Sequence, residues 1–101
     1  MENKEKIDMD EAFKQLCECL AAVDNADDIS KLLSDLCTYT EIEQLSQRLL
    51  CAKLLLQGYT YNEIIEMTDV SSATLSRVSR CIRHGSGGYS GALSKAAEED
   101  K

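Results

Sequence analysis

The residues with the clearest chemical potential lie together near the carboxyl end of the chain. Residues 71–84 contain three arginines and no acidic residue, and small hydroxyl-bearing side chains stand among them. Guanidinium groups bind phosphate or the acceptor edge of guanine, while hydroxyl and methyl groups contact other base edges. The pattern predicts binding to double-stranded DNA. The predicted contacts are Ser71, Ser72, Ala73, Thr74, Ser76, Arg77, Arg80 and Arg83.

The basic segment stands out because the rest of the chain is acidic. The formal net charge of the 101 residues is −7, and residues 1–35 carry ten acidic against four basic residues. Attraction to phosphate is mainly electrostatic and falls with salt. An acidic body therefore limits non-specific DNA binding and confines the attraction to one segment.

Two short helices are predicted to position these side chains. Thr60 and Glu63 have the spacing of a capping box, which predicts a helix over about 61–68. A second helix is predicted over about 72–83, with Ser71 or Ser72 as its cap. Asp69 stands in the turn where a left-handed residue is needed.

Together these elements predict a helix-turn-helix from Tyr61 to His84. The second helix would turn one face inward, and its other face would enter the major groove. The first helix adds Tyr61 and Asn62 to the predicted DNA contacts. The inward-facing residues are predicted to be Ile64, Ile65, Met67, Val70, Leu75, Val78 and Ile82.

The rest of the chain predicts an all-α fold. Proline is absent, and the glycines are Gly58 and four in residues 85–91. Amphipathic spacing predicts a helix over about 7–23 and a short one from Ile29 to Leu36. A capping box at Thr40 and Glu43 would open a central helix, whose wide apolar surface predicts a place at the centre of the core. Gly58 would end it in a left-handed cap.

This organisation corresponds to a single multi-helix domain over residues 1–101. Residues 7–57 are predicted to supply the core and dimerisation helices and residues 61–84 the helix-turn-helix. Residues 90–101 are predicted to be a mobile tail, either frayed or a loosely held helix. A chain this short carries more apolar surface than it can bury alone, which predicts a homodimer.

Other function classes find little support in the residues. An enzyme is not expected, because the single histidine, His84, has no evident catalytic partner in sequence. Neither a metal site nor a cofactor is predicted, and the five cysteines are interpreted as buried or half-buried thiols in a reducing cytosol. The charged amino terminus and the lack of an apolar run of roughly 20 residues predict a cytoplasmic protein without a membrane association.

One stretch of the sequence resembles a known family. Residues 73–77, Ala-Thr-Leu-Ser-Arg, look like the recognition-helix motif of the tryptophan-repressor superfamily. The arginine-rich helix that ends in Gly-Ser-Gly-Gly-Tyr at 85–89 is similar to the YerC/YecD branch, and the resemblance covers roughly residues 10–90. It implies an interlocked homodimer whose two recognition helices enter successive major grooves of a pseudo-palindromic operator.

The resemblance also implies a ligand pair. Arg48 and Arg77 match the two arginines that hold the corepressor in the tryptophan repressor. Val78 departs from the pattern, because the repressor has a glycine there that admits the indole ring. A regulator that does not need tryptophan is therefore expected. Two alternatives remain: a tryptophan-responsive repressor, and a protein-interaction module that docks on the transcription machinery.

Overall fold

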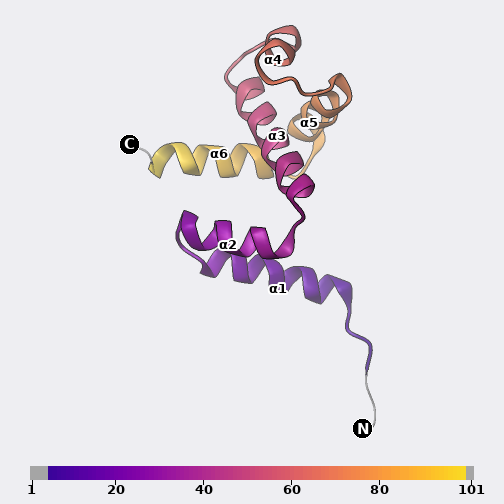
Figure 1. Ribbon diagram of the computed structural model, residues 1–101, viewed down its shortest axis with the longest axis vertical. Helices are drawn as coiled ribbons and strands as arrows, with labels where there is room; N and C mark the ends of the chain where they lie inside the picture. Colours follow the sequence, from indigo (N-terminus) through magenta and orange to yellow (C-terminus); the bar gives the residue numbers. More distant parts are fainter. Residues whose placement is uncertain (1–4, 100–101) are drawn as a thin grey trace. The chain divides into compact units, whose positions relative to one another are not determined.

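The chain folds into α-helices throughout the part that the structure describes. The computed structural model describes residues 5–99 and contains only helices and short connections in that range, so the predicted all-α class is confirmed (Figure 1). The helices are α1 (Met9–Ala22), α2 (Ala26–Leu36), α3 (Tyr39–Leu56), α4 (Tyr61–Thr68), α5 (Ser72–His84) and α6 (Gly88–Glu99).

The helices belong to two compact units, which divide between Thr38 and Tyr39. That the chain forms a single domain stays a prediction. The division into units has a physical cause in the first unit, where neither α1 nor α2 has a buried residue. Two amphipathic helices alone are too few to enclose a core, so their apolar faces stay accessible in the single chain.

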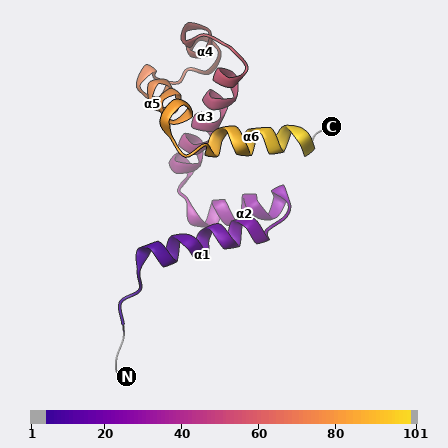
Figure 2. The ribbon, with the colours of Figure 1, turned by 180° about the vertical axis from the view of Figure 1, so that it is seen from behind.

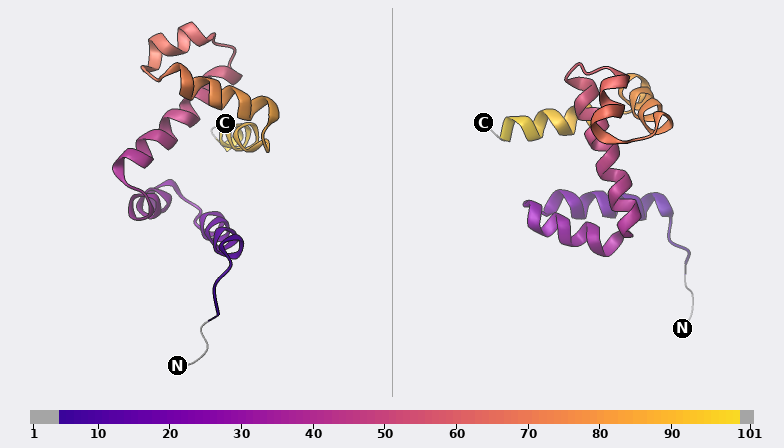
Figure 3. Two further views of the ribbon diagram at one scale, coloured as in Figure 1. Left: turned by 90° about the vertical axis from the view of Figure 1, so that its right-hand side faces the viewer. Right: turned by 45° about the horizontal axis from the view of Figure 1, so that its top comes forward.

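The first unit is a pair of helices that run in opposite directions (Figure 3). Asp8 caps α1 by accepting a hydrogen bond from the N–H of Asp10 at 3.1 Å. Asn25 caps α2, and its side-chain oxygen accepts from the N–H of Asp28 at 2.8 Å. Both predicted helices are confirmed, but α2 begins at Ala26, because the cap lies early in the acidic connection.

The second unit is built around α3, which contacts α4, α5 and α6. These three helices can be followed around α3 from both sides in Figures 1 and 2. The core is small and has contributions from α3, α4, the following turn and α5. Its buried members are Cys51, Ala52, Leu54, Ile64, Val70, Leu75 and Val78.

The central helix differs from its prediction in two respects. It begins at Tyr39, so Thr40 lies inside its first turn and the predicted cap at Thr40 is wrong. Thr38 and Glu41 have the same Thr-x-x-Glu spacing two residues earlier. Only the carboxyl-terminal half of α3 reaches the core of the unit, while the apolar side chains of its amino-terminal half stay largely exposed.

The end of α3 follows the prediction. Gly58 has a φ of +95°, and the N–H of Tyr59 donates to the carbonyl of Leu54 at 3.1 Å. This left-handed residue reverses the chain within two residues, so that α4 can begin at Tyr61.

The segment predicted as a mobile tail contains a helix. Helix α6 covers Gly88–Glu99 and contacts α3, with Tyr89 and Leu93 packed against the core. Tyr89 and Leu93 are four residues apart and therefore share one helix face. Their burial outweighs the helix-breaking tendency of the glycines around them.

The connection between α5 and α6 contains two glycines that the structure requires: Gly87 has a φ of +86°, and Gly85 lies close against backbone. A Cβ atom added at Gly85 would meet the backbone carbonyl of Cys81, whereas one added at Gly91 would meet nothing within 4 Å. We therefore expect Gly85→Ala to lower the free energy of unfolding by about 1–3 kcal/mol, since backbone must move. Gly91→Ala, inside α6, should raise it by about 0.5–1 kcal/mol. Chemical denaturation of the two variants measures both, and equal stabilities would contradict the packing described here.

Candidate nucleic-acid interface

Helix α4 begins with the capping box that the sequence predicts. The hydroxyl of Thr60 accepts from the N–H of Glu63 at 3.2 Å, and the Glu63 carboxylate accepts from the N–H of Thr60 at 2.8 Å. The hydrogen bond from the Thr60 backbone lowers the pKa of Glu63, with a smaller contribution from the Thr60 side chain. The ionised carboxylate thus holds the start of α4 at neutral pH.

The turn between α4 and α5 has a left-handed residue at its predicted place. Asp69 has a φ of +60°, and its N–H donates to the carbonyl of Ile65 at 3.2 Å. The hydroxyl of Thr68 donates to the carbonyl of Ile64 at 2.7 Å. Val70 follows and is 4% exposed, so the turn is anchored in the core.

The inward side of this helix pair is confirmed with one exception. Ile64, Val70, Leu75 and Val78 are buried, and Ile65 and Ile82 pack against the core as half-buried side chains. Met67 is 54% exposed, so its predicted inward position is wrong. The buried side chain of α4 is that of Ile64, three residues earlier, which is also predicted to face inward.

The opposite face of α5 is open to solvent and carries the predicted DNA contacts. The arginines Arg77, Arg80 and Arg83 are all exposed, as are Ser72, Ala73 and Ser76 near the start of the helix. Thr74 is half-buried. The residues at the buried side of the same helix are Leu75, Val78 and Ser79. Helix α5 is therefore divided into an apolar face in the core and a basic, hydroxyl-rich face outside it.

Three further predicted contacts lie at helix starts. Tyr61 and Asn62 are exposed in the first turn of α4. Ser71 is the N-cap of α5, and its hydroxyl accepts from the N–H of Thr74 at 3.1 Å. The hydroxyl proton of Ser71 is donated to Oγ1 of Thr74 at 3.0 Å. Two of the predicted contacts, Ser71 and Thr74, are thus joined to each other by two hydrogen bonds.

The two arginines implied as a ligand pair differ in their surroundings. Arg48 is half-buried on α3, and Arg77 is exposed on α5. Val78, next to Arg77, is 1% exposed and belongs to the core cluster. The position at which the resemblance would place a glycine is thus a packed core side chain in this protein.

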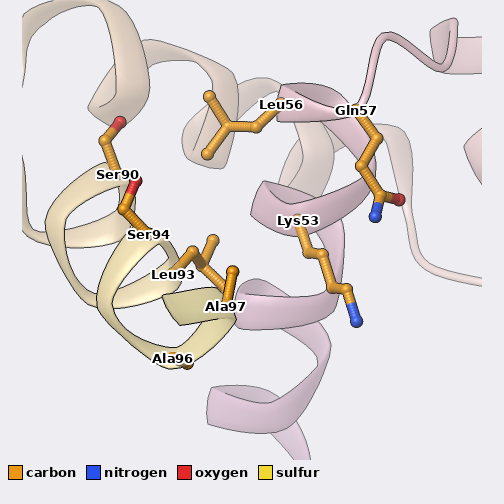
Figure 4. Close-up of a pocket in the computed structure, with 8 residues that line it drawn as sticks. All are labelled: Lys53, Leu56, Gln57, Ser90, Leu93, Ser94, Ala96 and Ala97. Atoms are coloured by element: carbon orange, nitrogen blue, oxygen red, sulfur yellow. The ribbon is translucent and has the colours of Figure 1, made fainter. Parts of the chain in front are cut away.

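Two open cavities border α6. One, of about 390 Å³, lies between α3 and α6, with Leu56 and Lys53 on one side and Leu93 on the other (Figure 4). The second, of about 430 Å³, involves Leu49, Cys81 and Tyr89. Neither is lined by Arg48 or Arg77. In the sequence, the four-residue spacing of Tyr89 and Leu93 is the pattern that indicates a packed helix over these residues.

The cysteines are spread over the two units rather than gathered in one place. Cys51 is buried, and burial raises the pKa of its thiol. Cys37 and Cys81 are half-buried, but Cys17 and Cys19 are exposed, which differs from the predicted burial. In residues 5–99, no group of three or more His, Cys, Asp or Glu side chains is placed to hold a metal ion. No helix in this range is long and apolar enough to cross a membrane.

Comparisons of the sequence with a protein family and with a single relative agree with each other. Residues 11–97 match the family described as Trp repressor protein. The uncharacterized protein YerC of Bacillus subtilis (strain 168) is 37% identical over 86 residues, which are 85% of this chain and 83% of that protein.

Two solved structures have the same fold. A candidate Trp repressor from Staphylococcus aureus is 37% identical with a TM-score of 0.81, and the alignment covers 86% of this chain and 87% of that one. A TrpR-like protein from Eubacterium eligens is 36% identical with a TM-score of 0.80, over 86% and 90% of the two chains.

Proposed function

The chain belongs to the Trp repressor family, and from that premise we propose that it is a sequence-specific transcriptional repressor that acts without tryptophan. Family membership indicates a DNA-binding regulator of the helix-turn-helix type rather than an enzyme. We further propose that α5 contacts the major groove, that the protein is a homodimer and that its operator is pseudo-palindromic.

The observation that carries the proposal is the division of α5 into two faces. Leu75 and Val78 fix one face in the core, so the opposite face is held outward with Arg77, Arg80 and Arg83 exposed. None of the residues 71–84 is acidic. An outward face of this composition offers guanidinium groups to phosphate and guanine, and its first turn offers hydroxyl and methyl groups to base edges.

The first variants to test are on this face. We expect Arg77→Ala and Thr74→Ala each to weaken binding to the operator by about 1–3 kcal/mol, because each removes a base contact. Arg83→Ala should instead weaken binding similarly for all sequences, because it removes a phosphate contact, and should reduce the salt dependence by about one counterion. Fluorescence anisotropy with operator and scrambled duplexes measures both effects.

Lys95→Ala is the matched control, since it removes an exposed positive charge from α6 rather than from α5. Its operator affinity should equal that of the unaltered protein. Unchanged affinity in Arg77→Ala would refute α5 as the recognition helix. Binding to a partner protein through apolar side chains would lack the steep loss with salt that DNA binding shows.

The homodimer is supported by the apolar side chains that the single chain leaves exposed. Large apolar residues are exposed on α1, at the end of α2 and along the amino-terminal half of α3. Such side chains are Met9, Phe13, Leu36, Tyr39, Leu45, Leu49 and Leu50. Exposed large apolar side chains in this number favour burial against another chain, and residues 7–57 are the proposed dimer segment.

Sedimentation velocity at micromolar concentration should give the mass of two chains. Leu45→Glu should weaken the dimer at least about 100-fold, because burial of one leucine contributes about 1.5–3 kcal/mol and the change occurs in both copies. Met67→Glu is the control, since Met67 is also exposed but lies on α4. A stable, folded monomer of the unaltered protein at this concentration would overturn the proposed dimer.

Independence from tryptophan is supported by the burial of Val78. A ligand that had to share this packed site would cost about 1–3 kcal/mol or more in strain. We therefore expect the operator affinity to be the same with and without millimolar tryptophan. The chain has no tryptophan of its own, so fluorescence reports directly whether the ligand binds.

A clear gain in operator affinity on adding tryptophan would restore the corepressor role of Arg48 and Arg77. Val78→Gly provides the complementary test at a temperature where circular dichroism shows it folded. Tryptophan binding that appears only in this variant would support the steric explanation.

A further inference from the structure

The cap of the recognition helix differs from the cap of the helix before it. In α4, the hydroxyl of Thr60 accepts from the backbone N–H of Glu63, and Glu63 returns a bond to the backbone N–H of Thr60. In α5, the hydroxyl of Ser71 accepts from the backbone N–H of Thr74 at 3.1 Å and also donates to the side-chain Oγ1 of Thr74 at 3.0 Å. The Ser71 cap of α5 therefore bonds the side chain of Thr74 as well as its backbone N–H.

The side chain held in this way is one of those proposed to contact a base. Threonine in a helix divides between two χ1 rotamers, because its hydroxyl has alternative partners in the preceding turn. The bond from Ser71 favours the rotamer that keeps Oγ1 of Thr74 near the helix start. Since Oγ1 already accepts a proton from Ser71, the hydroxyl proton of Thr74 is available for an acceptor outside the protein.

We propose that Ser71 is a positioning residue for base recognition: it acts through Thr74, whose hydroxyl it holds ready to donate to an acceptor in the major groove. The proposal rests on the DNA-binding function proposed above. The matching acceptors are purine N7, guanine O6 and thymine O4. Ser71 then affects which base is preferred at one position, beyond its contribution to helix stability.

The chain offers a matched pair of variants for the test. Ser71→Gly removes the hydroxyl, while glycine at an N-cap costs only a few tenths of a kcal/mol. Thr60→Gly makes the same kind of change at the cap of α4, which holds no side chain of the recognition helix. Ser71→Thr keeps a hydroxyl and should retain the base preference of the unaltered protein. The readout is the base preference at every operator position, obtained by selecting duplexes from a random pool.

We expect Ser71→Gly to reduce discrimination at a single base pair of each half-site by at least about fivefold, which is about 1 kcal/mol. The affected base pair should be the one that Thr74→Val also affects, and combining the two changes should add nothing there. Thr60→Gly and Ser71→Thr should select the motif of the unaltered protein. An unchanged motif in Ser71→Gly, or an equal loss at all positions, would overturn the proposal and leave the proposed DNA binding intact.

The free protein gives a second test that does not depend on selection. NMR couplings that report χ1 should show one rotamer for Thr74 in the unaltered chain and in Thr60→Gly. Averaged couplings are expected in Ser71→Gly, because glycine has no hydroxyl to bond Oγ1 of Thr74. Averaged couplings in the unaltered protein would overturn the positioning role. Failure of the unaltered protein to select any motif would refute the proposed function and this inference together.

Discussion

The arrangement of the second unit depends on the packing of α5 against α3. Leu75 and Val78 from α5 meet Cys51 and Ala52 from α3 in one small core, and Ile64 brings α4 to the same place. Burial of each large apolar side chain contributes about 1.5–3 kcal/mol. This contact fixes the rotation of α5 about its own axis, and the rotation in turn decides which of its residues reach solvent.

Local hydrogen bonds determine where each of these helices starts, and the core determines which way it faces. The Thr60–Glu63 box, the left-handed Asp69 and the Ser71 cap define α4, the turn and the start of α5. These are short-range interactions between residues at most four apart. The apolar contacts then bring the exposed arginines to one side, while the acidic residues of the chain lie outside α5. The three arginines of α5 are thereby held on the face that the core turns outward.

Much of the fold could be predicted because its signals are local. The capping box at Thr60, the left-handed Asp69 and the buried spacing of Leu75 and Val78 all follow from short-range rules and are confirmed. The resemblance to the tryptophan-repressor superfamily and its YerC/YecD branch is confirmed as well. The DNA contacts and the ligand pair stay predictions, because no contact within the protein distinguishes a base-reading arginine from a solvated one.

The predictions that are wrong concern places where two sequence patterns compete, or where burial in the core decides which residues are covered. Thr38 and Thr40 are both followed by a glutamate three residues later, and spacing alone could not decide between them. Met67 has an apolar side chain at a position that the core does not reach. Residues 90–101 are predicted as a tail because they are mostly polar, while the packing of Tyr89 and Leu93 in α6 depends on residues distant in sequence.

The central claim is that the outward face of α5 is the surface that meets DNA. Titration of isotope-labelled protein with duplex DNA at low salt, followed by NMR of backbone amides and arginine side chains, tests it most directly. We expect the largest shifts at Ser72–Arg77 and at the side chains of Arg77, Arg80 and Arg83, with smaller ones at Tyr61 and Asn62. Shifts confined to α6 or to the exposed side of α4 around Met67, with α5 unchanged, would contradict it.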